Sequence, residues 1–399
     1  MNLRGWVAVG GVFTILAVGA GVGFYATSAY VAALTSERGF GLTMASSGPT
    51  LSFVCAGLGG VVAARLLPRV GVRPLLLVGA LGTAAGLVVL GRTHSSWALW
   101  LSFALSGGVG ALMAVVPCTS LVTRWFAPHP AKALTIATTG LSAGGAVVPP
   151  FVVLLIERYG LQAAVNWLAV ATVAIVVAVV LVVRSPRGAS VSVLTGPVDG
   201  GEATSPRWTF PLLSAAFGLL MLSQVGAVTH ALTIAADRGI ADGALALTAL
   251  AAASVGARLL GIPLLGGLGL LRFSCAVALL QALSMAMLAV ADNLTMLVLA
   301  TSLLGATVGN AVVLMPLHML TAFGLPRFDR VFARLNLVAT AGTAGGPVLL
   351  GLLHDLFNGY GPALALLSAG SAVAAGLLFV ARVDTAGRWL RRVRVPAAA

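Results

Sequence analysis

One arginine could do chemistry, because it is a cation inside a long uncharged stretch. Arg258 is the single charged residue between Ala244 and Leu271. A cation near the centre of a membrane-spanning helix costs about 2.5–3.5 kcal/mol, so another group must offset it. Ser254 and Gly261, its neighbours on the helical face, are not acidic. The partner is therefore on another helix or is a ligand, and the guanidinium fork suits a carboxylate. An arginine that snorkels or binds backbone carbonyls is the alternative.

Other polar side chains in the apolar stretches could line a cavity around this guanidinium. We predict that the ligand-contacting residues, with Arg258, are Tyr25, Ser28, Tyr30, His230, Asn310 and Asn336. Further polar residues in these stretches are Thr27, Gln224 and His318. A buried hydroxyl or amide often only satisfies a neighbouring helix backbone, and a lone histidine is often structural, so that role stays open for each of them.

The composition determines which elements hold these residues. Of the 399 residues, 59% are hydrophobic and 8% are charged, whereas a soluble domain carries about 25% charged residues. The mean hydropathy is +1.05. Uncharged runs approach or exceed the roughly 20 residues that cross a bilayer as a helix, and the period-two alternation of membrane β-barrels is absent. The sequence therefore predicts an all-α membrane protein and excludes a water-soluble fold.

The apolar stretches divide into two sets of six, which predicts twelve transmembrane helices in two pseudo-symmetric bundles. The expected spans are 6–34, 43–64, 73–91, 97–122, 132–156, 161–183, 210–236, 244–266, 270–291, 294–322, 332–353 and 360–381. The expected units are an N-terminal bundle (1–183), a linker rich in Gly, Ser, Thr and Pro (184–209), a C-terminal bundle (210–382) and a basic tail (383–399).

A short sequence match between the halves suggests an internal duplication. Ala143-Gly144-Gly145 with Tyr159-Gly160 recurs 201 positions later as Ala344-Gly345-Gly346 with Tyr360-Gly361. Repeats of this kind build transporters whose site lies near the midplane between the halves. Pairs of glycines four residues apart, such as Gly140 and Gly144, let helices approach closely, either as static packing or as faces that slide.

The net charge of +13 follows the topology. Of the 23 basic residues, 18 fall on alternate connections and on the two ends of the chain, which the positive-inside rule places in the cytoplasm. We expect a protein of the plasma (inner) membrane with both termini cytoplasmic, surrounded by lipid. The basic excess is not read as a nucleic-acid footprint.

Motifs for enzymatic chemistry and cofactors are missing from the sequence. The three cysteines lie in apolar stretches without CxxC pairing, and the sequence holds no GxxxxGK[ST] loop and no HExxH. We therefore expect no metal, no cofactor and no enzymatic activity. Transport driven by an ion gradient, exchange and facilitated diffusion remain, with protons as a candidate coupling ion.

Four segments carry a resemblance to a known family. They are 68–74 with the apolar run after it; Arg124-Trp125-Phe126 with 140–150 and 156–160; Ala257-Arg258 with Gly261; and 345–355 with Tyr360-Gly361. In these segments the chain resembles the major facilitator superfamily, and within it the branch of monocarboxylate transporters and oxalate/formate antiporters. Tyr25 stands where the monocarboxylate transporters have a first-span lysine, and Ser254 replaces an acid that often accompanies the eighth-span arginine.

This resemblance implies a secondary transporter that works by alternating access, in which Arg258 binds a carboxylate. The residues expected to take part in conformational change are Arg69, Gly71, Arg73, Gly144, Gly345, Pro149 and Pro347. The expected substrate is a small organic anion, with a monocarboxylate as the leading candidate, and a monomer is expected. Efflux of a hydrophobic drug or metabolite is the first alternative, and a membrane sensor or assembly factor on a transporter scaffold is the second.

Overall fold

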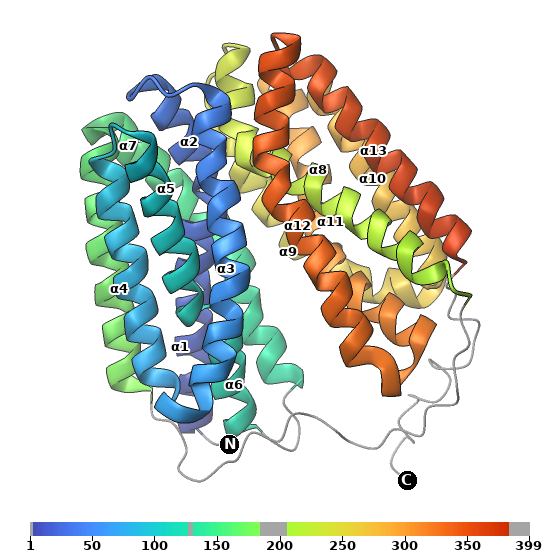
Figure 1. Cartoon of the computed structure of the whole chain (residues 1–399), viewed down its shortest axis with the longest axis horizontal. Coiled ribbons are helices and arrows are strands. Elements are labelled where there is room, and N and C mark those ends of the chain that lie inside the picture. The colour runs from blue at the N-terminus through green and yellow to red at the C-terminus, as the bar shows by residue number, and fades with distance from the viewer. Residues whose placement is uncertain (1–2, 127–130, 184–205, 383–399) are drawn as a thin grey trace.

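The computed structural model describes residues 3–126, 131–183 and 206–382, and these residues form helices and connections without a strand. The helices gather into two bundles that lie side by side (Figure 1). Most of the expected linker (184–205) and the whole expected tail (383–399) lie outside the described residues.

Each of the expected spans of the first half is found in the structure. Its elements are α1 (Leu3–Ala20), the π-helical turn η1 (Gly21–Tyr25), α2 (Thr27–Ser36), α3 (Leu42–Val70), α4 (Val72–Gly91), α5 (Ser96–Ala104), the π-helical turn η2 (Leu105–Val109), the 3₁₀ turn η3 (Gly110–Met113), α6 (Val115–Trp125) and α7 (Ala131–Val182). Two spans differ from a simple helix, because η1 interrupts the first and η2 with η3 interrupts the fourth.

Helix α7 is two spans in one continuous run. Its 52 residues would reach about 78 Å, far beyond the roughly 30 Å hydrocarbon core. At Gly160 the backbone leaves the helical region with φ 74° and ψ 165°, a conformation that favours glycine, and the chain turns back there. Eleven long apolar helices in the described residues thus supply twelve spans.

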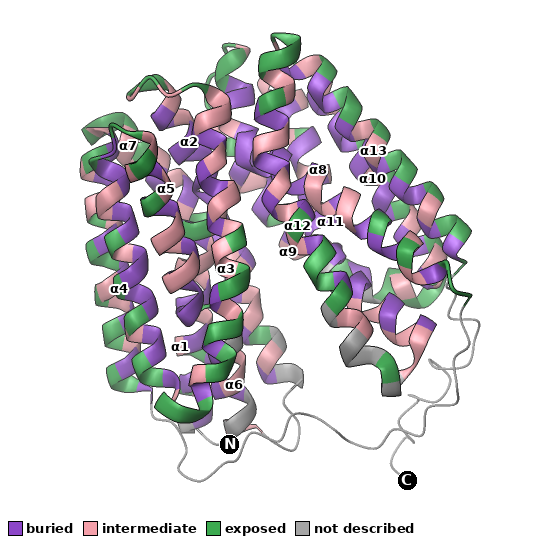
Figure 2. Ribbon diagram, in the orientation of Figure 1, coloured by how far each residue is buried: buried purple, intermediate pink, exposed green. Residues whose placement is uncertain are grey.

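The second half continues with six helices of nearly the expected bounds. They are α8 (Thr209–Asp237), α9 (Ala244–Leu268), α10 (Leu270–Val290), α11 (Leu294–Phe323), α12 (Leu325–Phe357) and α13 (Tyr360–Ala381). In both halves buried residues concentrate inside the bundle and exposed residues on its outer faces (Figure 2). Those outer faces carry large apolar side chains such as Trp97, Leu181 and Leu337, each more than 70% exposed, which suits contact with lipid.

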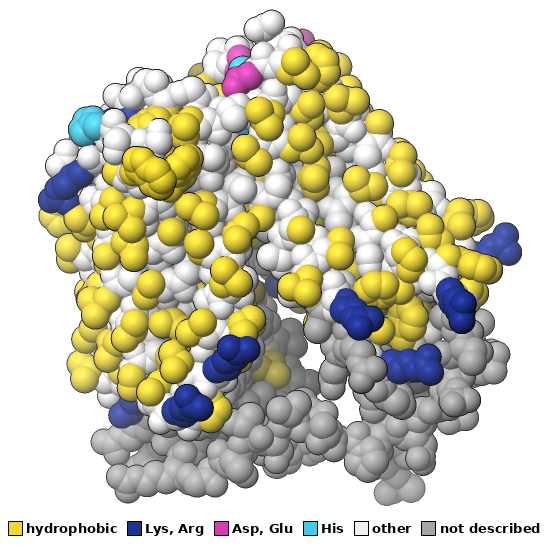
Figure 3. Space-filling view, in the orientation of Figure 1, with side chains coloured by type: hydrophobic (Ala, Val, Ile, Leu, Met, Phe, Trp, Pro, Cys, Tyr) yellow, Lys and Arg dark blue, Asp and Glu magenta, His cyan; other side chains and the backbone are white. Residues whose placement is uncertain are grey.

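Most of the described acidic residues lie towards one end of the molecule, and most of the described arginines lie towards the other. We call the end at which α1 begins and α13 ends the basic end. Its described arginines include Arg69, Arg73, Arg272 and Arg334, and Figure 3 shows Lys and Arg side chains there. We call the opposite end of the molecule the acidic end. It holds Glu37, Glu157, Asp237, Asp242, Asp292 and Asp355.

The halves touch at the acidic end and separate at the basic end. Two apolar core clusters towards the basic end draw residues from one half only, one around Val12 and Leu121 and the other around Phe217 and Leu335. The two clusters nearer the acidic end mix the halves: Tyr25 belongs to the cluster of α8, α9 and α13. Figure 3 shows the surface hollowed between the halves at the basic end. The conformation is thus open towards the basic end.

A repeated turn supports the duplication more directly than the match described from sequence. Glu37-Arg38-Gly39 follows α2 and Asp237-Arg238-Gly239 follows α8, each ending in a glycine of positive φ. Arg38 donates to the Gly91 carbonyl at the end of α4, and Arg238 donates to the Leu288, Ala289 and Ala291 carbonyls at the end of α10. The same three-residue device therefore closes equivalent helices in each half.

The tyrosine-glycine match, by contrast, joins positions that are not equivalent. Tyr159 is 62% exposed beside the turn at Gly160, whereas Tyr360 is 2% exposed and begins α13. The glycine of positive φ before α13 is Gly359, not Gly361. Identical letters at a fixed spacing were thus a poor guide to the register, because the connections between the spans differ in length.

Candidate functional site

Arg258 lies on α9 and is half-buried. Its Nε donates to the backbone carbonyl of Gly309 on α11, at 3.3 Å. No carboxylate among the described residues forms an ion pair with it, since the ion pairs found there join His354 to Asp237 and Asp355. One edge of the guanidinium is therefore anchored to backbone, as the alternative from sequence foresaw, while the charge has no acidic partner in the described chain.

Tyr25 brings the first half to this arginine. It belongs to the η1 turn, is 4% exposed, and lies beside both Arg258 and Ser254 of α9. Its ring packs directly against α7 at Gly145, where an added Cβ would lie only 2.6 Å from the ring. Two predicted ligand residues from opposite halves thus meet, and Gly145, which sequence reasoning did not select, makes room for one of them.

Close packing of α9 on α11 fixes where Arg258 sits. Gly305 lies against the Leu250 backbone and Gly309 against the Ser254 backbone, so neither glycine has space for a side chain. Asn310, a predicted ligand residue, is 8% exposed, donates to the Ala306 carbonyl and packs on Gly261. It is a neighbour of the Arg258 site, with its amide nitrogen already bonded.

The other first-span candidates lie elsewhere. Thr27 donates to the Phe24 carbonyl and Tyr30 points into the interior of the first half. Ser28 is fully buried and its Oγ accepts a hydrogen bond of 2.8 Å from the backbone N–H of Leu232 on α8. Ser28 therefore joins the two halves near the acidic end rather than lining the space around Arg258.

His230 is the centre of a second contact between the halves. It is fully buried; Nε2 lies 3.0 Å from the Pro347 carbonyl and 3.0 Å from Ser46 Oγ of α3, while Nδ1 lies 2.8 Å from the Tyr360 hydroxyl. Because a carbonyl only accepts, Nε2 carries the hydrogen. Tyr360 in turn lies 2.8 Å from Thr233 Oγ1. In this conformation His230 closes the acidic end.

A third contact completes the closure. Thr43 at the start of α3 donates to Asp355 near the end of α12 at 2.5 Å, and Asp355 also pairs with His354 at 3.1 Å. Together, Ser28–Leu232, Ser46–His230 and Thr43–Asp355 form what we call the latch. Sequence reasoning missed Thr43, Ser46 and Asp355, because short polar residues near helix ends carry no signal of a distant partner.

The remaining polar candidates have structural partners or lie apart. Gln224 donates to Gln281 and Thr307 inside the second half, and His318 bonds to Ser274. Asn336 is exposed on the part of α12 nearer the basic end. The structure therefore brings Arg258, Tyr25 and Asn310 together, and it does not bring Gln224, His318 or Asn336 into that group.

The residues predicted to take part in conformational change differ in what surrounds them. Arg73 donates twice to the Val183 carbonyl, and Gly71, with φ 80°, turns the chain between α3 and α4. Arg69 is exposed beside them. At the basic end Arg73 thus ties the connection after the second span to the end of the sixth span.

The predicted glycines and prolines of the fifth and eleventh spans also differ in what surrounds them. Gly144 packs against the Ala17 backbone of α1, whereas nothing lies within 4 Å of where a Gly345 side chain would begin. It is Gly346 that packs on α8, at Gly226 and Leu222. Pro149 and Pro347 are both buried, and the Pro347 carbonyl is a partner of His230.

A groove of ≈ 550 Å³ lies between the halves at the acidic end, formed by α2, α7, α8 and α9. Its lining is mostly alanine, leucine and isoleucine, with Glu157 and Asp242 as its charged members. Arg258 does not line it. Within the described ranges, no group of three His, Cys, Asp or Glu residues could hold a metal ion.

Comparison with known proteins decides the family. The model of the Major Facilitator Superfamily matches residues 12–324, most of the chain. The chain belongs to this superfamily. Membership in the superfamily agrees with the twelve spans and supports a transporter rather than an enzyme.

Superfamily relatives match over shorter segments. A fujikurins efflux protein of Gibberella fujikuroi is 28% identical over 185 residues, 46% of this chain and 37% of its own. Monocarboxylate transporter 12 of Homo sapiens is 30% identical over 114 residues, 29% of this chain and 21% of its own. The matched part thus spans less than two fifths of either relative.

Solved structures of the superfamily share the fold over nearly the whole chain. The crystal structure of a bacterial homologue of the human lysosomal transporter Spinster, inward-facing and unoccupied, aligns with a TM-score of 0.72 at 15% identity, covering 96% of this chain and 97% of that one. At this identity the likeness concerns the fold alone.

Proposed function

We propose that this protein is a secondary transporter that moves a small organic anion, a monocarboxylate in the first instance, by alternating access. The observation that carries the proposal is the unpaired charge of Arg258 between the halves, beside Tyr25. A carboxylate would pair with the free edge of the guanidinium, and the Tyr25 hydroxyl could donate to it from the opposite half. A ligand held by both halves is the requirement for coupling binding to their movement.

The conformation fits one step of such a cycle. The latch closes the acidic end while the basic end is open, so the anion would reach Arg258 from the basic end. By the positive-inside rule that end faces the cytoplasm, which makes the structure inward-facing in a plasma membrane. Gly345, with open space beside it, belongs to a face that would close when the halves rock.

Substitution of the arginine tests the proposal. Uptake of labelled short monocarboxylates and dicarboxylates into proteoliposomes is compared for wild type, Arg258→Gln, Arg258→Lys and the control Arg272→Gln, an exposed arginine of α10. A hydrogen bond to a charged group contributes about 1.5–3 kcal/mol, so Arg258→Gln should lower uptake at subsaturating substrate by about 10- to 100-fold. Arg258→Lys should keep part of the activity and the control should keep all of it.

A pH gradient across the same vesicles tests protons as the coupling ion: an inward gradient should accelerate uptake if they are. Equal uptake by wild type and a folded Arg258→Gln variant would reject the anion site. The second candidate is efflux of a hydrophobic metabolite, favoured by the similarity to the fujikurins efflux protein over 46% of the chain. Export of neutral hydrophobic compounds that is insensitive to Arg258→Gln would support that function.

A further inference from the structure

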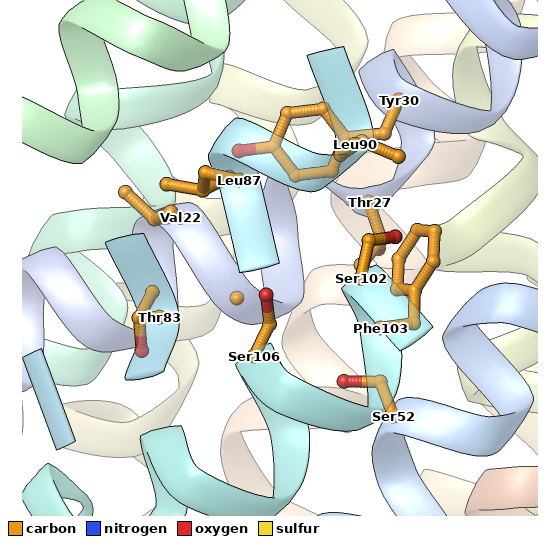
Figure 4. A pocket seen from close by; sticks show the side chains of 11 residues that line it. Val22, Thr27, Tyr30, Ser52, Thr83, Leu87, Leu90, Ser102, Phe103 and Ser106 are labelled. Atoms are coloured by element: carbon orange, nitrogen blue, oxygen red, sulfur yellow. The ribbon is translucent and has the colours of Figure 1, made fainter. Parts of the chain in front are cut away.

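The groove between the halves at the acidic end has a lining that the transport proposal does not use. It carries carboxylates, unlike the cavity of ≈ 20 Å³ inside the first half (Figure 4), whose lining residues are all uncharged. Its volume of ≈ 550 Å³ falls within the range of about 300–1,000 Å³ that is usual for ligand clefts. Arg258 does not line it, so the groove is separate from the proposed anion site.

The groove is apolar in its depth and acidic at its mouth. On α7 its lining runs from Pro150 to Glu157, about 10 Å along the helix, and Glu157 lies at the acidic end of the fifth span. Asp242 lies in the connection before α9, at the same end. Small and apolar side chains form the deeper walls, among them Ala29, Ala32, Val153 and Leu232. A ligand that fits this arrangement has an apolar tail towards the middle of the membrane and a cationic head at its surface.

Both carboxylates at the mouth are free to take such a head. The ion pairs of the described residues join His354 to Asp237 and Asp355, so Glu157 and Asp242 have no cationic partner in that part of the chain. Both are exposed. One comes from the first half and the other from the second, at the edges of a single groove.

The surroundings of the groove identify its occupant. Leu154 lines the groove and is 42% exposed, so the groove continues onto the outer face that suits contact with lipid. Arg158, exposed beside Glu157, offers a cation for a phosphate group, which a free organic cation lacks. A primary ammonium can donate hydrogen bonds to carboxylates, whereas a quaternary ammonium cannot. We propose that the groove binds a phospholipid whose head group bears a primary amine, with the ammonium at Glu157 and Asp242 and an acyl chain along the alanine wall.

This position gives the lipid a part in closing the acidic end. Its ammonium contacts a carboxylate from each half, so it holds together two elements that must part when the acidic end opens. A ligand that binds one conformation better than the other shifts the population towards it. The lipid therefore favours the conformation that is open at the basic end, and it does so without touching the latch.

Native mass spectrometry of the protein released from mixed vesicles tests the proposal. The vesicles contain equal amounts of phosphatidylethanolamine and phosphatidylcholine with the same acyl chains, so that only the head group differs. The wild type should retain one phosphatidylethanolamine in several-fold preference. Glu157→Gln and Asp242→Asn should each lower this preference by about two- to fivefold, the range for partly exposed charge pairs. The control Asp292→Asn, an exposed acid of the same end outside the groove, should leave it unchanged.

Three results would overturn the proposal. One is equal retention of the two lipids by the wild type, and another is an unchanged preference in both folded groove variants. The third is tighter binding of dodecylammonium than of phosphatidylethanolamine, which would assign the groove to a free amphiphilic cation.

Protection of a cysteine in the groove gives an independent test of place. Ala32→Cys, in a background without the three native cysteines, should react with a maleimide several times more slowly in phosphatidylethanolamine nanodiscs than in phosphatidylcholine nanodiscs. Asp292→Cys in the same background should react equally in both, because it lies outside the groove. Equal labelling of Ala32→Cys in the two lipids would contradict the proposal.

Discussion

The interiors of the two halves differ in chemistry although their helices correspond. In the described part of the first half, all buried polar side chains other than tyrosine are serines or threonines, and no Asn, Gln, His or charged side chain is buried there. The second half also buries His230, His318, Gln224, Gln281 and Asn310, and it carries Arg258. Duplicated bundles have thus kept their helix packing and diverged in what they can bind.

This difference separates two tasks. Groups that hold a charge need a rigid surround, and the second half supplies one where Gly305 and Gly309 let α11 pack tightly against α9, the helix of Arg258. Hydroxyls can turn to donate or accept, so the first half can change partners at low cost at the latch, where Ser28, Thr43 and Ser46 make its contacts. We infer that the second half holds the charge of the ligand, while the first half contributes Tyr25 and moves against the second half.

The largest expected effect comes from two glycines, one in each half, that differ in their surroundings. Gly144→Val should destabilise the protein by about 3 kcal/mol or more, because its side chain would press on the Ala17 backbone, which cannot move aside as a flexible side chain can. Gly345→Val has open space, so the folded state should be little affected while transport falls when that face must close. Thermal unfolding and proteoliposome uptake measure the two effects. Equal destabilisation by both variants would contradict the division between them.

An intermediate effect is expected across the His230–Ser46 contact. His230→Leu leaves the Tyr360 hydroxyl and the Pro347 carbonyl without their hydrogen-bond partner, the imidazole ring. It should lower the free energy of unfolding by about 1–3 kcal/mol. Ser46→Ala should cost only about 0.5–1.5 kcal/mol, since His230 keeps its bond to the Pro347 carbonyl.

The readout for this pair is maleimide labelling of a cysteine placed at Ala32, a groove residue, in a background without the three native cysteines. Labelling should rise more in His230→Leu than in Ser46→Ala. Stronger labelling in Ser46→Ala than in His230→Leu would mean that the first half controls the closure of the acidic end, which would contradict the division of tasks between the halves.

The smallest effect is expected at the exposed member of the latch. The Asp355 side chain is 47% exposed, so water replaces much of what is lost. Thr43→Val removes the donor and should cost less than about 1 kcal/mol, and Asp355→Asn, which keeps an acceptor oxygen, should cost still less. Unfolding midpoints measure both. A loss as large as that of His230→Leu would mean that the rim, not the buried histidine, holds the acidic end closed.

Hydropathy predicted the spans well because crossing a bilayer depends on the sum of many residues. The expected stretches 210–236 and 360–381 nearly coincide with α8 and α13. The interruption of the first span at Gly21–Tyr25 was not predicted, because a π-helical turn leaves the local hydropathy unchanged. The break at Gly160 was predicted, since polar residues and a glycine mark it.

The site was harder to predict because it depends on partners from distant spans. Arg258 could be found, since an isolated cation in an apolar run can be recognised from the sequence alone. Ser28 and Tyr30 were grouped with it, yet Ser28 belongs to the latch and Tyr30 points into the interior of the first half. The repeated Glu37-Arg38-Gly39 and Asp237-Arg238-Gly239 turns were readable from the letters and would have given a sounder register than the tyrosine-glycine match.

The latch also sets an energetic scale for switching. Three hydrogen bonds with a net value of about 0.5–1.5 kcal/mol each contribute roughly 1.5–4.5 kcal/mol to the closed acidic end, which biases the two openings by about ten- to a thousandfold. A ligand that binds one opening more tightly than the other by a similar factor could offset that bias. The polar part of the closure is thus matched to the differential affinity that a single charged contact can provide.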